Sequence, residues 1–539
     1  MQSRNNRGEK GITLFIAAAA LTMIVPTLGM FVDVGILYAA KARLQSSVDG
    51  AALAAARALN LGDSPTEQQS NAQQNALNWF YANFPSGNWS TSSTQMTLNS
   101  VQFTTGSNVR SVQVTASTNV PTFFMQWFNV AFSTISATGQ ASRRDVVIMM
   151  VMDRSGSMNQ NNACSNMRNA AKIFTGQFAA GRDQLGMVEF GDTAWVDSAP
   201  TTNFQSVLGY TNNSGSSAGL IDTINCNDNT NTPEALSLGY NELYKTNLPG
   251  AFNILMFFTD GIPNSMTLNF QNVMLSTSGC RDSTSRAISS GGSFVNHPPS
   301  WTPGWSFGSG YYTTSIPAGP IGVVASDDPN GAGTYGVRQY EGYSQSNDNH
   351  GTLTSGEAPG CSFPSNELNY VNDYQLLPPT DVWGNSLVEN SYNSLTTDAN
   401  GNIVLSSMAT AGAPLTGNNL IFHYAARNAA DEAAQQARSN ATLPVTIFGV
   451  GLGGTSLAPP GYAFMMRITN DPNADLYNSP ALYTACSTEA TCQNWPSQPQ
   501  GTFIFSSEPS QLSTVFLEMS SQILRLAHQT NKCCSVPSF

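Results

Sequence analysis

The stretch VVIMMVMDRSGSMNQ, residues 146–160, decides the fold of this chain. Its apolar run ends in a carboxylate, Asp153, and two hydroxyl residues, Ser155 and Ser157, follow at alternate positions around Gly156. A continuous apolar run predicts a strand buried on both faces, as in a parallel sheet covered by helices. Ligand groups in such sheets gather beyond the carboxyl ends of the strands. We therefore expect Asp153 at a binding edge, with both hydroxyls aimed at one point by the turn that glycine permits.

A second stretch, FNILMFFTDGIP at residues 252–263, repeats the pattern and ends its apolar run at Asp260. Between the two strands, Thr230 precedes a helix that we expect to begin near Pro233. Three loops with carboxylate or hydroxyl groups are thus predicted to meet above one sheet edge. Oxygen ligands suit a hard divalent cation, Mg²⁺ in the first place, with Mn²⁺ and Ca²⁺ as alternatives. The competing explanations are a turn with a helix N-cap, and Thr232 in place of Thr230 at the helix start.

Further segments alternate between strand and helix patterns in the order of a doubly wound α/β domain with a mostly parallel sheet. We predict strands at 184–191, 193–199 and 443–453, a helix at 418–440, and a last strand and helix within 501–526. This domain is expected over residues 143–530, followed by a tail at 531–539.

A large insertion interrupts this domain at residues 263–416, which are rich in Gly, Ser, Asn, Pro and aromatic residues. A loop of such length without structure is uncommon inside a domain, and its aromatic content does not fit simple disorder. Two expectations remain open: the insertion covers or shapes the predicted site, or it is a decoration without contact to the metal.

The composition limits the function classes. The chain has 539 residues, a formal net charge of −12 and only 10% charged residues, so we expect two or three domains and no nucleic-acid partner. About 25% charged residues is usual for soluble proteins, and the neutral polar surface indicates a location outside the cytoplasm.

The eight cysteines include no CxxC pair, and the four histidines have no metal-binding spacing with them. Disulfide bonds in an oxidising compartment are therefore favoured over a zinc site or a set of reduced thiols. Cys164 follows the first metal loop and Cys226 precedes Thr230, so a Cys164–Cys226 bond is expected at the sheet edge. The remaining candidates are Cys280–Cys361 within the insertion, Cys486–Cys492 across a short loop, and bonds to another chain for Cys533 and Cys534.

Residues 11–32 carry no charge and predict a membrane-spanning helix, within an N-terminal anchor and extended helix at 1–60. The basic residues before it, Arg4, Arg7 and Lys10, predict a cytoplasmic N-terminus with the rest of the chain outside. Cleavage as a signal peptide near Ala40–Ala42 and a buried core helix are the alternatives.

Residues 61–142 predict a small α+β unit, because alternating segments at 95–105, 108–118, 120–128 and 131–142 indicate antiparallel strands. Residues 7–59, with their basic start, apolar helix, Asp33 and LQSSVDGAALAAA run, resemble the N-terminal region of Flp pilus-assembly TadE/TadG-like proteins. VPTFFMQWFNV resembles their segment after the helix. Glutamate, which the true pilins of this system carry soon after their cleavage-site glycine, is missing after Gly11, so we expect an uncleaved anchor.

The oxygen constellation resembles the metal-ion-dependent adhesion site (MIDAS) of von Willebrand factor type A (VWA) domains. In that family the hydroxyls touch the metal directly or through water, the aspartates act largely through water, and a sixth position stays open for a partner's carboxylate. The corresponding residues are Asp153, Ser155, Ser157, Thr230 and Asp260.

Together the resemblances imply a single-pass protein of a bacterial inner membrane, with its bulk periplasmic or extracellular. Its expected partners are a protein ligand that supplies a carboxylate and other pilus-assembly components. A structural scaffold, whose metal only stabilises loops, is the alternative. No enzymatic activity is expected, because a haloacid-dehalogenase-type phosphatase needs a second aspartate where Ser155 stands, and no activated nucleophile or phosphate loop is evident.

Overall fold

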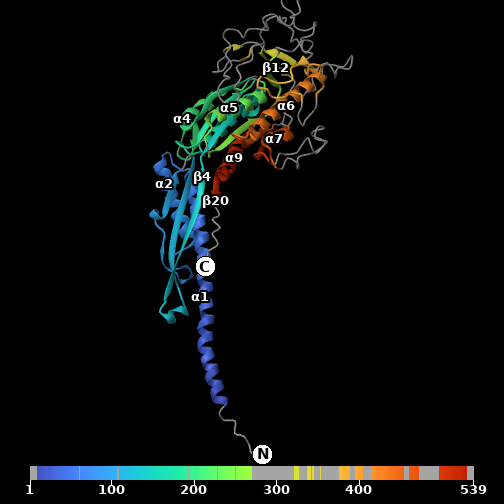
Figure 1. Cartoon of the computed structure of the whole chain (residues 1–539). Coiled ribbons are helices and arrows are strands. Elements are labelled where there is room, and N and C mark those ends of the chain that lie inside the picture. The colour runs from blue at the N-terminus through green and yellow to red at the C-terminus, as the bar shows by residue number, and fades with distance from the viewer. Residues whose placement is uncertain are drawn as a thin grey trace, which may run out of the picture. The chain divides into compact units, whose positions relative to one another are not determined.

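The structure is a computed structural model in which the described residues form two compact units (Figure 1). One unit comprises the described residues up to Arg144 and from Leu526 on, and the other those from Asp145 to Arg525. The described residues are 9–59, 61–62, 64–105, 108–191, 193–226, 229–248, 250–269, 321–326, 337–340, 343–344, 352–353, 376–388, 395–404, 416–453, 461–472 and 497–530.

The N-terminal unit is built on one long helix, α1 (Glu9–Ala58), and a shorter helix, α2 (Pro65–Asn83), that packs against it. The facing residues include Ala51, Ala55, Ala72 and Ala76, all fully buried. Small side chains let two helices approach closely. The alanine-rich sequence after the apolar run therefore becomes helix contact surface.

A five-stranded antiparallel sheet lies along α1 in the same unit. Its long hairpin pairs β3 (Val109–Pro121) with β4 (Phe132–Arg144) from end to end, and residues of β3 alternate between buried and less buried positions. The other strands are β1 (Ser92–Gln95), β2 (Val101–Thr105) and β20 (His528–Thr530), with short helices η1 (Asn88–Ser90), η2 (Leu98–Ser100) and η3 (Met125–Phe128).

Two features of this unit differ from the sequence prediction. Strand character was expected through residues 120–128, but β3 ends at Pro121 and η3 forms the turn of the hairpin. Asp33 of α1 accepts hydrogen bonds from backbone N–H groups in this turn, which takes them out of any strand ladder. The chain also returns to the unit near its end, where β20 pairs with β4, although residues up to 530 were assigned to the second domain.

The second unit contains a six-stranded sheet in the order β19-β18-β10-β5-β6-β7. All neighbours are parallel except β7, which pairs antiparallel with β6 at one edge. The strands are β5 (Val146–Asp153), β6 (Gln184–Phe190), β7 (Ala194–Thr201), β10 (Phe252–Thr259), β18 (Thr446–Leu452) and β19 (Phe503–Ser506). The predicted α/β class with a mostly parallel sheet is confirmed.

Helices cover both faces of this sheet. The core on one face joins α5 (Thr232–Thr246), α6 (Thr416–Ser439) and α7 (Tyr462–Thr469) to strand residues such as Val151 and Phe257. On the other face, the Phe516 ring of α9 (Leu512–Ala527) packs against Phe258 of β10 and Phe174 of α3 (Ala163–Thr175). Because successive strand residues face opposite ways, one apolar run serves both layers.

Shorter elements complete the second unit. They are η4 (Gly156–Asn162), α4 (Phe204–Leu208), β8 (Tyr210–Asn212), β9 (Gly215–Ser217), η5 (Leu220–Thr223), β11 (Ser265–Asn269), β12 (Ile321–Ser326), β13 (Val337–Tyr340), β14 (Tyr343–Ser344), β15 (Thr352–Leu353), β16 (Leu376–Leu377), β17 (Ile403–Val404) and η8 (Pro509–Gln511).

Only parts of the predicted insertion at 263–416 lie among the described residues. Its first strand, β11, pairs with β12, which pairs with β13. Met266 and Leu268 of β11 are buried in a small core with Leu377, Ile403 and the start of α6, including Phe422. The described part of the insertion therefore folds onto the second unit through its own apolar contacts.

We predict that Phe257→Ala destabilises the second unit by about 3–5 kcal/mol. Phe257 is fully buried on a central strand and its ring stacks on Phe190 at a centroid distance of 5.7 Å. Urea unfolding followed by circular dichroism measures the change. Leu517→Ala is the control, since Leu517 is 41% exposed and its loss is expected to cost about 0.5 kcal/mol or less. Equal effects of the two substitutions would contradict the assigned core.

Candidate metal centre

Strand pairing places the two predicted aspartates side by side. β5 and β10 are parallel neighbours with Met152 opposite Phe258, so Asp153 and Thr259 end adjacent strands. The Thr259 hydroxyl donates a hydrogen bond of 2.5 Å to Oδ2 of Asp153. Asp260 follows immediately. Both aspartates therefore lie at the carboxyl-end edge of the sheet, as the sequence predicted.

The two serines lie between these aspartates. Oγ of Ser157 donates to Oδ1 of Asp260 at 2.7 Å, and Oγ of Ser155 donates to the same oxygen at 3.2 Å. The two hydroxyl oxygens are 3.0 Å apart. The backbone N–H of Ser155 donates to Oδ1 of Asp153 at 2.7 Å. Four of the five predicted residues thus form one continuous polar cluster.

Thr230, on a third loop, lies close to Gly261 at the edge of this cluster. A Cβ atom placed on Gly261, the residue after Asp260, would lie 3.5 Å from the Thr230 hydroxyl oxygen. The N-cap of α5 is Asn231, whose side chain accepts from the N–H of Glu234 at 3.4 Å. The helix start is therefore accounted for by Asn231, and neither Thr230 nor Thr232 has that role.

The start of the insertion fixes the Thr230 loop. Oδ1 of Asn264 accepts from the Thr230 N–H at 2.7 Å, and the Thr230 carbonyl accepts from the N–H groups of Asn264 at 3.1 Å and Ser265 at 3.2 Å. All three residues are buried. The first described residues of the insertion therefore position a predicted metal ligand, and this part of it is more than a decoration.

The centre is electrostatically unfavourable without a cation. Asp153 is fully buried and Asp260 is 3% exposed. Burial raises the pKa of Asp153 to about 6. Burial and the neighbouring charge of Asp153 raise the pKa of Asp260 to about 7. Two buried like charges repel at short range, and a divalent cation would offset this repulsion.

The available atoms fit a hard cation. Two carboxylates and three hydroxyls supply only oxygen, the donor type that Mg²⁺ prefers. Among the described residues there is no group of three or more His, Cys, Asp or Glu that could hold a metal. Any metal here would consequently depend on the hydroxyl oxygens of Ser155, Ser157 and Thr230 as well as on the two carboxylates.

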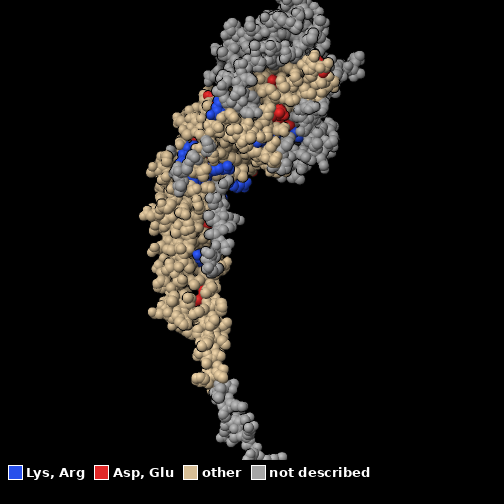
Figure 2. Space-filling view, viewed as in Figure 1, with Lys and Arg blue, Asp and Glu red and all other residues tan. Residues whose placement is uncertain are grey.

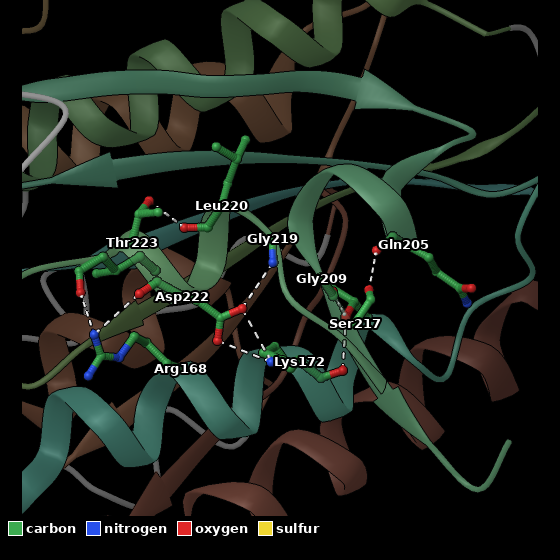
Figure 3. A network of polar contacts seen from close by, with 11 residues as sticks. Arg168, Lys172, Gln205, Gly209, Ser217, Gly219, Leu220, Asp222 and Thr223 are labelled. Carbon is green, nitrogen blue, oxygen red and sulfur yellow. Dashed lines mark hydrogen bonds and ion pairs between the residues drawn. The ribbon is translucent and has the colours of Figure 1, made fainter. Parts of the chain in front are cut away.

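A separate set of contacts holds the chain that leads to Thr230 (Figure 3). Lys172 of α3 pairs with Asp222 at 3.1 Å, and Arg168, one turn earlier, donates to the carbonyl of Ile224 at 3.0 Å. Asp222 also accepts from the N–H of Gly219 at 2.9 Å. Residues 219–224, which precede the Thr230 loop, are thus held against α3, the helix that follows the DxSxS loop.

A disulfide bond joins the same two segments. Cys164 and Cys226 are bonded, with their Cα atoms 6.2 Å apart, inside the range of up to about 7 Å that a bridge tolerates. This prediction from the sequence is confirmed. The predicted pairs Cys280–Cys361 and Cys486–Cys492, and the tail residues Cys533 and Cys534, lie outside the described residues.

Sequence reasoning missed Thr259 and Asn264, which orient Asp153 and Thr230 respectively. A hydroxyl directly before a strand-end aspartate is a signal for the first. The second follows only from the tertiary structure, because Asn264 lies 34 residues from Thr230 in the sequence.

We predict that Asp260→Asn stabilises the protein in EDTA at pH 8 but has little effect at pH 4.5. An aspartate whose folded pKa is raised to about 7 binds its proton more tightly in the folded state. Its contribution to stability is therefore lost as pH rises from about 4 through 7. Asparagine removes this penalty. Thermal unfolding across this range measures the difference, expected to be at least about 3 °C at pH 8. A difference in Tm between Asp260→Asn and wild type that does not change with pH would contradict the raised pKa of Asp260.

The disulfide is expected to hold the metal loops together. Replacing both Cys164 and Cys226 by Ala should lower stability by about 2–4 kcal/mol and weaken Mn²⁺ binding severalfold, because the Thr230 loop gains freedom. Urea unfolding and calorimetric Mn²⁺ titration measure these effects. Lys172→Met, which removes only the adjacent ion pair, serves as the milder control. Unaltered Mn²⁺ affinity in the cysteine variant would show that the bond does not position the site.

Comparisons with known structures give resemblances of low identity. A point mutant of the PilB minor pilin of Streptococcus sanguinis shares 12% identity at a TM-score of 0.32, covering 79% of this chain and 78% of its own. The pilus adhesin SpaC of Lactobacillus rhamnosus GG shares 11% at 0.30, covering 81% and 35%. The vWF domain of the type V pili tip protein Mfa5 of Porphyromonas gingivalis shares 14% at 0.30, covering 71% and 95%.

TM-scores at this level carry no argument about the present chain. A comparison with curated proteins found no match. Family models give a defined result: a von Willebrand factor type A domain matches residues 148–262, and a Flp pilus-assembly TadE/G-like model matches residues 11–58. The first range contains all five residues of the candidate centre. Both resemblances predicted from the sequence are confirmed, and this chain therefore joins a TadE/G-like pilus-assembly region to a von Willebrand factor type A domain.

Proposed function

We propose that this protein is a membrane-anchored, extracytoplasmic binding protein of the Flp pilus system. It binds a carboxylate of a protein partner through a divalent cation, Mg²⁺ in the first place. The observation that carries the proposal is the shared Oδ1 atom of Asp260, which accepts hydrogen bonds from both Ser155 and Ser157. Two loops thereby bring oxygen atoms to one point, and the Thr230 hydroxyl of a third loop lies beside Gly261, the next residue after Asp260.

In this proposal the two aspartates have different roles in holding the cation. Asp153 fixes the DxSxS loop through the N–H of Ser155 and is itself fixed by Thr259. Asp260 orients the serine hydroxyls. When bound, the cation supplies an electrophilic centre for a partner's carboxylate. Since neutral hydroxyls make up the majority of the donor set, they leave the cation more of its charge than carboxylates alone would.

The anchor in this proposal is α1. Among the described residues, one helix is long and apolar enough to cross a membrane, Leu14–Ala58, and only 6% of its apolar window is buried. This exposure does not fit a core helix. We propose a single pass through the bacterial inner membrane with the N-terminus cytoplasmic, because basic residues precede the span. Other pilus-assembly components are the further partners.

One observation favours the alternative of a structural scaffold. His528 pairs with Arg143, so the chain enters and leaves the VWA domain through paired strands of the TadE/G-like unit. An assembly role would place the domain as an insert in that unit, with the metal needed only to stabilise loops. We propose no enzymatic activity for either candidate, because Ser155 stands where a phosphatase of this sheet type needs its second aspartate.

The test compares Asp153→Ala with wild type in two assays. Calorimetric titration with Mn²⁺ should show a loss of affinity of at least roughly tenfold. Co-sedimentation with purified Flp pili in Mg²⁺ should be lost, as it should be for wild type in EDTA. Glu518→Gln, on the exposed face of α9, is the control and should behave as wild type.

The number of assembled pili separates the two candidates. A binding role predicts normal pilus numbers in cells with Asp153→Ala, with attachment lost. A scaffold role predicts reduced pilus numbers whether or not a ligand is present. Metal-independent co-sedimentation together with normal Mn²⁺ affinity would refute the proposed binding mechanism.

A further inference from the structure

The turn of the β3–β4 hairpin presents apolar side chains to solvent. Phe123 is 53% exposed, Trp127 64% and Phe128 56%, and Phe132 at the start of β4 is 56% exposed. No charged residue occurs between Pro121 and Phe132. An exposed apolar patch on an otherwise polar protein marks a contact surface. We call these residues, 122–132, the aromatic tip.

The aromatic tip is fastened to one level of α1. The carboxylate of Asp33 accepts from the N–H groups of Phe123 at 2.9 Å, Phe124 at 2.9 Å and Met125 at 2.7 Å. Asp33 is 1% exposed. One turn earlier, a Cβ atom on Gly29 would lie 2.2 Å from the Phe124 ring, so the ring rests on bare helix backbone. The height of the tip along α1 is thus fixed by two independent contacts.

That level is the end of the uncharged run. Residues 11–32 carry no charge and extend for about 33 Å as a helix, close to the roughly 30 Å of a bilayer's hydrocarbon layer. Asp33 is the next residue. Figure 1 shows α1 continuing beyond the hairpin end toward its N-terminus. Exposed apolar side chains continue on the helix here, including Phe31 at 69% and Val34 at 54%.

We propose that the aromatic tip inserts into the interfacial region of the lipid bilayer, in the leaflet on the side of the folded units. Trp and Phe side chains favour the membrane interface, and tryptophan belts flank membrane spans. Burial of the Asp33 carboxylate under three N–H groups removes an exposed charge from this zone. Figure 2 shows few charged side chains on the visible face of the N-terminal unit. The aromatic tip of the hairpin and the adjacent part of α1 would then lie in the membrane side by side.

This inference rests on the proposed anchoring by α1, and the experiment separates the two. The full chain is reconstituted into phosphatidylcholine–phosphatidylglycerol vesicles whose acyl chains are brominated either near the headgroup or near the chain end. The difference in tryptophan emission between wild type and Trp127→Phe isolates the signal of Trp127. The same difference for Trp79→Phe is the control, because Trp79 lies against Gly50, about 25 Å further along the helix from Asp33.

Trp127 is expected to lose at least about half of its emission in the vesicles brominated near the headgroup, and less in the others. Trp79 should respond to neither. Asp33→Ala should reduce the quenching of Trp127 by releasing the turn, whereas Asp49→Ala, at an exposed position of α1, should not. In each background, the signal of Trp127 is the difference in emission between the single variant, Asp33→Ala or Asp49→Ala, and the double variant that also carries Trp127→Phe.

Carbonate extraction reports anchoring separately. Acrylamide in the aqueous phase serves as a second quencher. If the chain stays in the vesicles but Trp127 is quenched by acrylamide and not by the brominated lipids, the insertion of the tip is overturned. If neither acrylamide nor the brominated lipids quench Trp127, the insertion is also overturned, and a protein partner covers the tip instead. A chain released by carbonate overturns the proposed anchoring, and the inference with it.

Discussion

Two buried carboxylates at the ends of neighbouring parallel strands are the constraint on which the VWA domain depends. Asp153 and Asp260 are brought together because β5 and β10 pair in parallel with little offset. Such proximity is costly for like charges in a buried position, and the surrounding residues respond with hydrogen-bond donors from Ser155, Ser157 and Thr259. A bound cation would offset the electrostatic repulsion that remains between the two carboxylates.

Asp33 is a buried aspartate, like Asp153 and Asp260, but hydrogen-bond donors from the backbone satisfy its carboxylate. Three backbone N–H groups converge on its carboxylate, and charge-assisted bonds of this kind satisfy a buried anion. There is no second carboxylate in this set of bonds. Asp33 accordingly joins the helix to the hairpin, whereas Asp153 and Asp260 lie buried beside each other, where a bound cation would offset their repulsion.

Pairing between strands far apart in the sequence also determines which residues belong to each of the two units. β4 ends at Arg144 and its partner β20 begins at His528, so the VWA domain is inserted between two paired strands. Within that domain, the first residues of the insertion bind the Thr230 loop, and the Cys164–Cys226 bond ties the segment before it to α3. The loop that carries Thr230 is therefore held by Asn264 of the insertion and, before it in the sequence, by the disulfide bond to α3. Two such contacts suit a rigid binding edge.

The sequence by itself determined the elements whose signals are local. Continuous apolar runs predicted the buried strands β5 and β10, their terminal aspartates predicted the site edge, and the uncharged run before Asp33 predicted the long helix. The disulfide at Cys226 followed once both loops were placed on one edge. Tertiary structure alone decided the return of β20, the turn at the aromatic tip, and the role of Asn264. These depend on hydrogen bonds between residues far apart in the sequence, and no local pattern of side chains records which distant group a backbone N–H will meet.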